Sequence, residues 1–325
     1  MTHQIRILSE KDVRRALDMP TAIDVMSSAF SSLSSGMYQM PVRMVTNFGK
    51  TTLFSKPAAS HGDGVVGVKL LTQTPLNRER KPNSKPEQSL PVIQGVIILT
   101  DYFDGRFLTM MDGTYITALR TGAASGLATK LLSNHDVKVA AIFGAGAQGR
   151  TQLSAICTVR GLEKVYIFDF CQDTVVAYIK EMQPQCCAKL IRGDSLEVLK
   201  EVELICTATD STTPLFSLKD VKEGVHINAI GSYKPSMVEI ASDVVAHAAL
   251  YVDHQESAWA ESGVIQKSHV VGELGALING EIRGRTDASQ ITLFKSVGVA
   301  VQDLAAANAV YRSAVAQNIG VMVEI

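Results

Sequence analysis

The sequence has little charge and no excess of either sign. Charged residues make up 19% of the 325 residues, and 31 basic against 32 acidic side chains give a net charge of -1. A protein that binds nucleic acid through the phosphates needs a basic excess. We therefore expect no nucleic-acid partner.

Long hydrophobic runs are missing as well, although apolar residues make up 46% of the chain. That much apolar material excludes a disordered chain, and the length fits one to two domains. The longest apolar runs, such as residues 91–99, contain polar residues and are too short to span a bilayer. Residues 1–20 carry charges throughout, without the apolar core of a signal peptide. We expect neither a membrane partner nor a leader segment.

Cysteine and histidine are present without the spacing of a metal site. The five cysteines, at positions 157, 171, 186, 187 and 206, are typical of free thiols in a reducing compartment. Among seven histidines, His247 and His254 lie seven residues apart, and structural histidines explain them best. No Ser/His/Asp pattern stands out. We expect no metal and a cytoplasmic enzyme.

The residue patterns that are present change character along the chain. Ser9 and Asp12 fit a helix capping box, and a second helix is predicted from Pro20 to a stop at Gly36. Short β-like runs follow at 43–48, 64–72 and 92–100, and a polar stretch at 78–89 is predicted to be a surface loop.

Strands and helices then alternate. After a helix predicted at 121–133, apolar strand-like runs occur at 137–143, 164–169, 204–208, 225–230 and 250–253. Helical patterns are found at 147–160, 173–183 and 298–317. This alternation predicts an α/β fold with a doubly wound parallel sheet.

A glycine-rich motif follows the first of these strands. Gly144, Gly146 and Gly149 form a G-x-G-x-x-G string that opens a helical pattern, which is the context of a dinucleotide site. Asp169 ends the next strand, where an acidic residue accepts hydrogen bonds from ribose hydroxyls and favours NAD over NADP. The alternative is a structural glycine turn followed by an ordinary strand-end aspartate.

Several segments together resemble the ornithine cyclodeaminase/mu-crystallin family. They are GVK at 67–69, DGTYITALRTGA at 112–123, GAGAQ at 144–148, SVG at 296–298, and Asp303. The resemblance implies a homodimer with a Rossmann domain at 121–299. It also implies an α+β substrate-binding and dimerisation domain at 1–120, which the C-terminal helix at 300–325 rejoins, with the active site in the cleft between the domains.

Three cations are the candidate substrate residues. Lys69 stands in an apolar run, where a lysine is costly to bury without an anionic partner, and the planar forks of Arg43 and Arg120 suit a carboxylate. The alternative is that each cation pairs with a structural carboxylate. By the resemblance, Lys69 and Arg120 match substrate-site positions, and Arg43 matches a carboxylate-binding arginine.

The resemblance also implies the residues that contact NADH or NADPH. They are Arg120, Thr121, Gly144, Gly146, Ala147, Gln148, Gly149, Asp169, Thr207, Thr209, Asn228, Ile230, Ser296 and Val297.

The reaction that family members share concerns a C=N bond and a hydride at the carbon beside a carboxylate. Tyr233 stands where cyclodeaminases of the family have a catalytic aspartate, and a tyrosine is a poor base at neutral pH. We therefore expect reduction of Δ1-pyrroline-2-carboxylate to L-proline, with the six-membered Δ1-piperideine-2-carboxylate as a second substrate. The alternatives are an alanine-dehydrogenase-like enzyme, an ornithine cyclodeaminase, and a mu-crystallin-like protein that binds NAD(P)H and a ligand without turnover.

Overall fold

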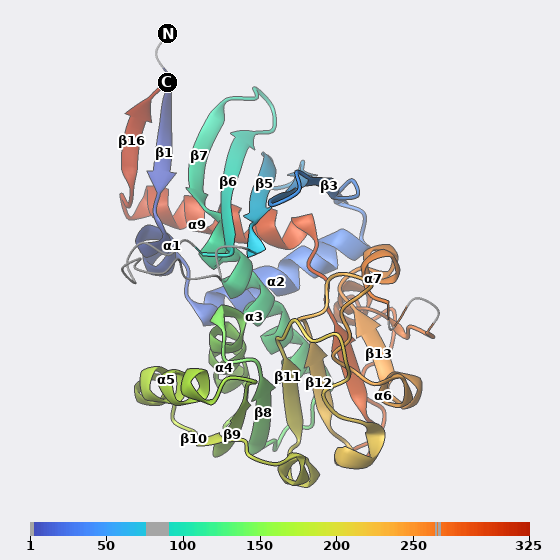
Figure 1. The fold of residues 1–325 in the computed structure, drawn as a ribbon. Helices are drawn as coiled ribbons and strands as arrows, with labels where there is room; N and C mark the ends of the chain where they lie inside the picture. Colours follow the sequence, from blue (N-terminus) through green and yellow to red (C-terminus); the bar gives the residue numbers. More distant parts are fainter. Residues whose placement is uncertain (1–2, 76–90, 264, 266–267) are drawn as a thin grey trace. The chain divides into compact units, whose positions relative to one another are not determined.

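The computed structural model describes residues 3–75, 91–263, 265 and 268–325. Their contacts divide the chain into two units (Figure 1). The first unit comprises Met1–Asp18, Gly36–Thr117 and Ala300–Ile325, and the second comprises Met19–Ser35 and Ala118–Val299. The loop predicted at 78–89 lies outside the described residues.

The first unit is built on a largely antiparallel sheet in the order β16-β1-β7-β6-β5-β4-β2, with β3 also paired to β4. Only β1 and β7 run parallel among these pairs. The strands are β1 (Gln4–Leu8), β2 (Tyr38–Gln39), β3 (Met44–Asn47), β4 (Thr52–Ser60), β5 (Val65–Gln73), β6 (Ile93–Asp101), β7 (Phe107–Asp112) and β16 (Val321–Glu324).

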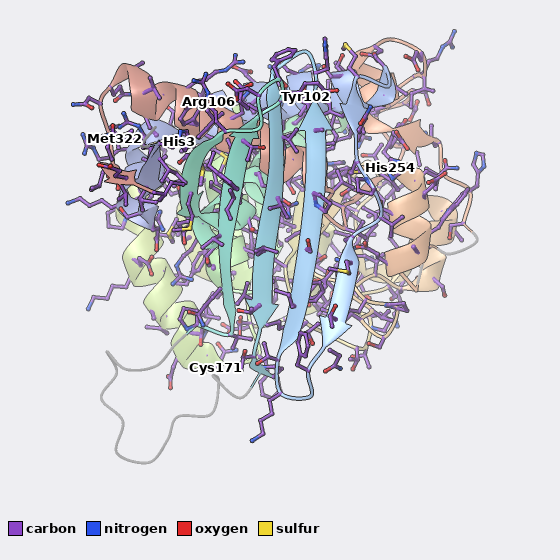
Figure 2. All side chains as sticks on the ribbon, turned by 90° about the horizontal axis from the view of Figure 1, so that it is seen from above. His3, Tyr102, Arg106, Cys171, His254 and Met322 are labelled. Carbon is purple, nitrogen blue, oxygen red and sulfur yellow. The ribbon has the colours of Figure 1, made fainter. Side chains whose placement is uncertain are left out.

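Two helices complete this unit. Helix α1 (Glu10–Ala16) begins with the capping box expected from Ser9 and Asp12. Helix α9 (Ala300–Ala316) packs on the inner face of β4, β5 and β6. Gly67 permits this close packing, because a Cβ there would lie 2.7 Å from a methyl group of Leu304. In Figure 2 no described helix of the first unit covers the other face of the sheet, where Tyr102 and Arg106 mark the β6–β7 turn.

The second unit holds a parallel sheet in the order β10-β9-β8-β11-β12-β15-β13-β14, which confirms the predicted doubly wound α/β class. Its strands are β8 (Val139–Phe143), β9 (Lys164–Phe168), β10 (Lys189–Arg192), β11 (Leu204–Thr207), β12 (His226–Ala229), β13 (Ala249–Val252), β14 (Gly272–Glu273) and β15 (Thr292–Lys295). Every residue of β11, β12 and β15 is buried, as expected for strands covered on both faces.

The chain reverses direction across this sheet beside β8. It runs from β8 outward to β9 and β10, then returns to form β11 on the other side of β8. At such a switch point the loops at the carboxyl ends of the strands diverge and leave room for a ligand.

The second unit also contains most of the helices. Their bounds are α2 (Met19–Ser34), α4 (Ala147–Val159), α5 (Gln172–Met182), α6 (Ser242–His247), α7 (Gln255–Glu261) and α8 (Leu274–Ile278), with short 3-10 turns at Gln183–Gln185, Leu196–Lys200 and Leu218–Asp220. Helix α2 lies in this unit although the sequence grouped it with the first 120 residues. The reason is packing, since Ile23 of α2 lies against Gly126 and near Ala155.

One helix begins earlier than the sequence predicts. Helix α3 spans Gly113–Leu132, eight residues longer at its start than the predicted 121–133, so Arg120 lies inside the helix and not at its beginning. The Asp112 carboxylate accepts a hydrogen bond from the backbone N–H of Tyr115 at 2.7 Å, as a helix cap does. Arg160 donates to the carbonyl oxygens of Thr129 and Lys130 at the other end of α3.

A search of the described helices found none with the length and apolar character that crossing a bilayer requires.

Candidate functional site

The glycine-rich turn joins β8 to α4 in the second unit. Gly144 has φ +105°, and a Cβ there would clash with the carbonyl oxygen of Ala208. Gly149 is equally restricted, because its Cβ would clash with the carbonyl oxygen of Gly144. Gly146 differs from both: a Cβ there would meet nothing within 4 Å. Two glycines therefore close the turn, and the third leaves open space in front of it.

That open space lies at the beginning of helix α4. Gly146 is the N-cap residue and provides no side-chain hydrogen bond to the first turn. Backbone N–H groups at a helix N-terminus attract anions, above all phosphates. The turn therefore fits a pyrophosphate, the group that the sequence motif predicts there.

Asp169 follows β9 beside this turn. Its carboxylate accepts hydrogen bonds from the backbone N–H of Ala145 at 2.8 Å and of Cys171 at 3.0 Å. The carboxylate is thus fixed to the glycine-rich turn, with lone pairs left for further donors.

The nearby cation Arg150 is held by other groups. Its guanidinium donates to the Glu181 carboxylate at 2.6 and 3.0 Å and to the carbonyl oxygen of Ala145 at 2.8 Å. These bonds raise the pKa of Arg150 and keep its charge turned toward Glu181.

The remaining predicted cofactor residues lie at the carboxyl ends of β11, β12 and β15 or on α3, where Thr121 is buried. Thr207 and Gln148 each have a buried side-chain oxygen without a hydrogen-bond partner among the residues that the structure describes. Buried oxygens are normally satisfied, so these two suit a bound polar ligand. The protein atoms present therefore fit a dinucleotide.

Two predicted cofactor side chains are engaged with the protein itself. The hydroxyl of Thr209 donates to the buried Glu239 carboxylate at 2.9 Å. The amide of Asn228 donates to the hydroxyl of Thr129 at 2.9 Å. Ile230 is buried in the turn that follows β12.

The turn after β15 is organised by a carboxylate that the sequence did not single out. Asp253 is buried and accepts hydrogen bonds from the hydroxyl of Ser296 (2.7 Å) and the backbone N–H groups of Val297 (3.0 Å) and Gly298 (2.7 Å). The guanidinium of Arg120 lies directly against Gly298, where a Cβ would come within 2.5 Å of Nη1.

In the first unit, Lys69 of β5 points toward α9. Its Nζ atom donates to Asp303 Oδ1 at 2.7 Å and to the hydroxyl of Thr117 at 3.0 Å. The Lys69 and Asp303 side chains are 1% and 2% exposed. Lys69 thus has a buried carboxylate partner, as the sequence argument about burial requires.

A second buried lysine, which the sequence analysis missed, lies on the same face. Lys56 of β4 is directly opposite Lys69 in the antiparallel register. The signal available in the sequence was its place between Phe54 and Ala58 at a spacing of two residues, which puts the three side chains on one face of a strand. Arg43 stands just before β3 and is half-buried, with its Cζ atom 5.5 Å from the centre of the Phe54 ring.

Tyr233 lies in the turn after β12 in the second unit and is half-buried. The Nζ atom of Lys234 is 5.5 Å from the centre of its ring. The preceding backbone N–H, that of Ser232, donates to Glu239 at 3.0 Å and ties this turn to the same carboxylate as Thr209.

Comparison with known proteins agrees with the expected family. The ornithine cyclodeaminase/mu-crystallin family matches residues 3–318. A Δ1-pyrroline-2-carboxylate reductase of Bacillus cereus is 33% identical over 98% of this chain and 99% of its own length.

Two solved structures have the same fold. The Thermococcus litoralis Δ1-pyrroline-2-carboxylate reductase, in complex with NADH and L-proline, has a TM-score of 0.91 at 31% identity and covers 98% of this chain and 99% of its own. An archaeal alanine dehydrogenase dimer with bound NAD has a TM-score of 0.90 at 29% identity, with the same coverage of both chains. This chain belongs to the ornithine cyclodeaminase/mu-crystallin family.

Proposed function

We propose that this protein is an oxidoreductase that reduces the C=N bond of Δ1-pyrroline-2-carboxylate to L-proline with a reduced nicotinamide coenzyme. The similarity to reductases of that name over nearly the whole chain supports this reaction. A bound reduced nicotinamide supplies the hydride. Reaction of the imine with one hydride and one proton gives the amine, so the protein must bind an anionic imino acid and keep its nitrogen protonated.

The observation that carries this proposal is the buried contact of Lys69 with Asp303 and Thr117. An ammonium group in a site that excludes water attracts a carboxylate far more strongly than it would in water. Asp303 keeps that charge in place before substrate arrives. Lys69 is therefore assigned to hold the substrate carboxylate or to donate the proton, with Arg43 and Arg120 as further carboxylate ligands.

Tyr233 favours reduction over the cyclodeaminase alternative. Cyclisation of ornithine with loss of ammonia needs a group that removes a proton from an amine or activates water. A tyrosine at this position is a poor base at neutral pH and can still donate a hydrogen bond. Reduction of a protonated imine does not need that base.

The test is a comparison of substrates with the purified protein. We expect NADH oxidation with Δ1-pyrroline-2-carboxylate, and a slower reaction with Δ1-piperideine-2-carboxylate, because one methylene is worth about 1–3 kcal/mol in a pocket. Alanine with NAD tests the dehydrogenase alternative. Ornithine with catalytic NAD tests the cyclodeaminase, with ammonia and proline as the products measured. Robust release of ammonia, or tight NADH binding without any turnover, would overturn the proposed reaction.

For the coenzyme, we propose a preference for NADH over NADPH. The Asp169 carboxylate repels a 2′-phosphate, and the residues after it, Phe170-Cys171-Gln172, provide no cation. Arg150, the nearby arginine of the turn, is bonded to Glu181.

We also propose that two copies of the chain form a homodimer through the open face of the sheet in the first unit. Its outward-pointing side chains on β4, β5, β6 and β7 are mostly apolar: Leu53, Pro57, Val66, Val68, Leu70, Val96, Ile98 and Met110. An apolar face of this extent usually marks an interface, and a family relative is a dimer. Light scattering should report a dimer, and Ile98→Lys at the centre of the face should give a monomer.

The five free thiols support a reducing, cytoplasmic compartment.

A further inference from the structure

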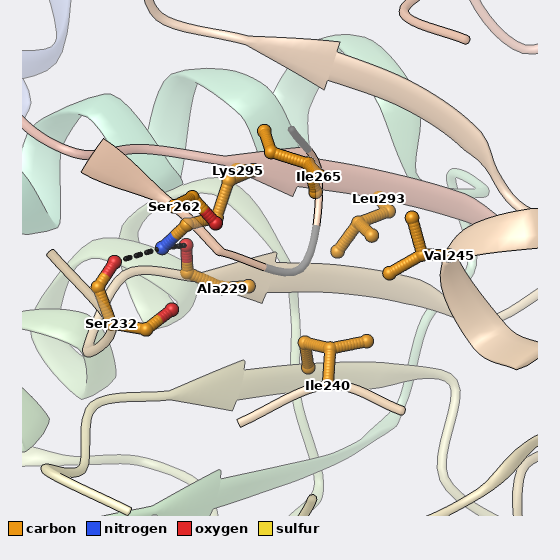
Figure 3. Close-up of a pocket in the computed structure, with 8 residues that line it drawn as sticks. All are labelled: Ala229, Ser232, Ile240, Val245, Ser262, Ile265, Leu293 and Lys295. Carbon is orange, nitrogen blue, oxygen red and sulfur yellow. Dashed lines mark hydrogen bonds between the residues drawn. The ribbon is translucent and has the colours of Figure 1, made fainter. Parts of the chain in front are cut away.

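A buried lysine in the second unit has no role in the reaction described so far. Lys295 ends β15, and 3% of its surface is exposed. Its Nζ atom donates to three backbone carbonyl oxygens: those of Ala229 at 3.2 Å, Ser296 at 3.3 Å, and Ser232 at a shorter distance. Figure 3 shows the ammonium between the turn that carries Ser232 and the end of β12.

These carbonyl groups belong to two turns that the proposed function uses. Ala229 and Ser232 enclose the turn after β12, which leads to Tyr233, and Ser296 begins the turn after β15. One ammonium group therefore ties together two loops at neighbouring carboxyl ends of the parallel sheet. The two strands are adjacent and parallel, with Ala229 opposite Lys295.

The N–H groups of the same loops are tied to buried carboxylates. Glu239 accepts from the backbone N–H of Ser232 in the turn after β12, and also from that of Thr209 after β11, while Asp253 accepts from those of Val297 and Gly298 after β15. The loops are thus held by one cation on their carbonyl side and two anions on their N–H side. Charge-assisted hydrogen bonds of this kind are stronger than neutral ones.

The surroundings of Lys295 also keep bulk water away. A cavity of about 10 Å³ beside it, lined by Ser262, Ile265 and Leu293 among others, has room for about one water molecule. The buried hydroxyl of Ser262 has no hydrogen-bond partner within the described part of the chain. Burial lowers the pKa of Lys295 to about 8, because desolvation outweighs the attraction of Glu239, Asp253 and Glu261.

We propose that Lys295 is a positioning residue whose ammonium form holds the turns after β12 and β15 in the conformation that binds the reduced nicotinamide coenzyme. An ammonium group has three hydrogens, one for each of the three carbonyl oxygens. The neutral amine has two hydrogens and a lone pair, so one carbonyl oxygen then faces a lone pair and the turns loosen. This inference rests on the proposed function, since it takes the second unit as the coenzyme-binding part.

The consequence is a coenzyme affinity that falls as the pH rises. Lys295 is charged below its pKa and loses its proton above it, so the proposed clamp weakens between about pH 7 and about pH 9.5. The free energy of unfolding responds in the opposite direction. The unfolded chain keeps the proton on this lysine to higher pH than the folded protein does, so the contribution of Lys295 to stability rises over the same interval. A lysine with a purely structural role would show the second effect without the first.

The experiment is a fluorescence titration with NADH, without imino acid, at pH values from about 7 to about 9.5. Because the exposed Cys171 thiol lies near Asp169 and its pKa is lowered by hydrogen bonding to Thr174, all proteins carry Cys171→Ser. We expect the Kd for NADH to rise about tenfold across this range in the parent protein, as loss of one charge-assisted clamp implies. Lys295→Met should bind NADH about tenfold more weakly at pH 7 and show no further pH dependence.

The matched control is Lys222→Met, which removes an exposed lysine paired with Glu203 in the same unit. It should keep the parent affinity and the parent pH profile. A parent Kd that is constant over the range, or parent-like NADH binding by Lys295→Met, would overturn the proposal. If Lys295→Met does not fold, the parent profile alone decides. The NADH titration contains no imino acid. A protein that fails to reduce Δ1-pyrroline-2-carboxylate can therefore still be tested for the pH dependence of NADH binding, and the two failures are distinguished.

Discussion

Three of the buried basic side chains, Lys69, Lys295 and His226, have three different surroundings. In the first unit, Lys69 faces the carboxylate of Asp303. In the second unit, Lys295 faces three backbone carbonyl oxygens, and His226 lies between the hydroxyl of Thr292 and the side-chain oxygen of Asn228. The partner differs in each case: an anion, a set of dipoles, and two neutral side chains.

The kind of partner decides what happens to the charge. Burial lowers the pKa of His226 to about 3, so this imidazole is neutral, and that of Lys295 only to about 8, where neighbouring carboxylates oppose desolvation. Lys69 has the Asp303 carboxylate in direct contact at 2.7 Å. The neutral imidazole of His226 can lie in the core without a counterion. The charged groups of Lys69 and Lys295 are costly to bury, and each lies where it can act on a ligand or a loop.

The largest effect should come from removing the charge of Lys69. We expect Lys69→Met to lower kcat/KM for imine reduction by about a thousandfold or more, since an interaction with the reacting anion is lost. It should also destabilise the fold by about 3–5 kcal/mol, because the buried Asp303 carboxylate loses its contact with the Lys69 ammonium. Steady-state kinetics and thermal unfolding measure the two effects.

The double variant Lys69→Met/Asp303→Leu separates catalysis from stability. It removes both charges, so it should recover most of the stability and none of the activity. NADH affinity should stay at the parent value in both variants, because the residues proposed to bind the coenzyme lie in the second unit. Recovery of activity in the double variant would mean that the pair has only a structural role.

Strands and site residues that are defined by neighbours in the sequence could be predicted, whereas those that depend on residues far away in the chain could not. The strands β8, β11 and β12 are recognisable because each is a short apolar run within an alternating pattern. Strand β10 was missed because its four residues, Lys189–Arg192, begin and end with a cation, and β15 because its run of three apolar or β-branched residues is too short to stand out.

The same distinction holds for the candidate site. The glycine turn is local, so its geometry follows from spacing along the chain. Asp253 and Glu239 gain their significance only from donors that are about 7 to 45 residues away, which no local pattern contains. Lys295 follows the short run of β15 that did not stand out, so the burial argument used for Lys69, which has apolar residues on both sides, did not reach it.

A smaller effect is expected from the neutral base. His226 has a pKa of about 3 in the folded protein against 6.5 in the unfolded chain. Below pH 6.5 the unfolded chain therefore binds a proton that the folded protein does not, and stability is lost as the pH falls toward 3. Between about pH 7 and about pH 5 this group alone should cost about 2 kcal/mol of unfolding free energy. Denaturant unfolding at several pH values measures it.

The variant His226→Gln has no titrating group at this position, so its stability should depend less on pH over that interval than that of the parent. The exposed His247 provides the matched control, and His247→Gln should retain the parent slope. An unchanged slope in His226→Gln would show that the imidazole takes up its proton in the folded state as easily as in water. His226 could then not be counted as a base that is neutral in the folded protein, in contrast to Lys69 and Lys295.

The next largest effect should come from Asp253, the carboxylate that accepts hydrogen bonds from the turn after β15. We expect Asp253→Asn to raise the Kd for NADH about tenfold, because an amide oxygen replaces a carboxylate that accepts three hydrogen bonds around Ser296–Gly298. Asp243→Asn is the control, since Asp243 is exposed and accepts from the backbone N–H of Leu218. Parent-like NADH affinity in Asp253→Asn would separate the turn after β15 from coenzyme binding.

The smallest effect concerns Asp169, an anion that acts on the coenzyme itself. The parent protein should use NADH better than NADPH, and Asp169→Ala should reduce the ratio of the two kcat/KM values by about fivefold, because repulsion of the 2′-phosphate is removed. Alanine also removes the acceptor for the N–H groups of Ala145 and Cys171, which lowers the affinity for both coenzymes. Asp169→Asn distinguishes the two effects: it loses the charge but keeps one acceptor oxygen, enough for one of the two N–H groups. If repulsion sets the preference, Asp169→Asn shifts the ratio as far as Asp169→Ala does while binding NADH more tightly. A parent protein that prefers NADPH would refute the assignment and would imply that Arg150 leaves Glu181 to bind the phosphate.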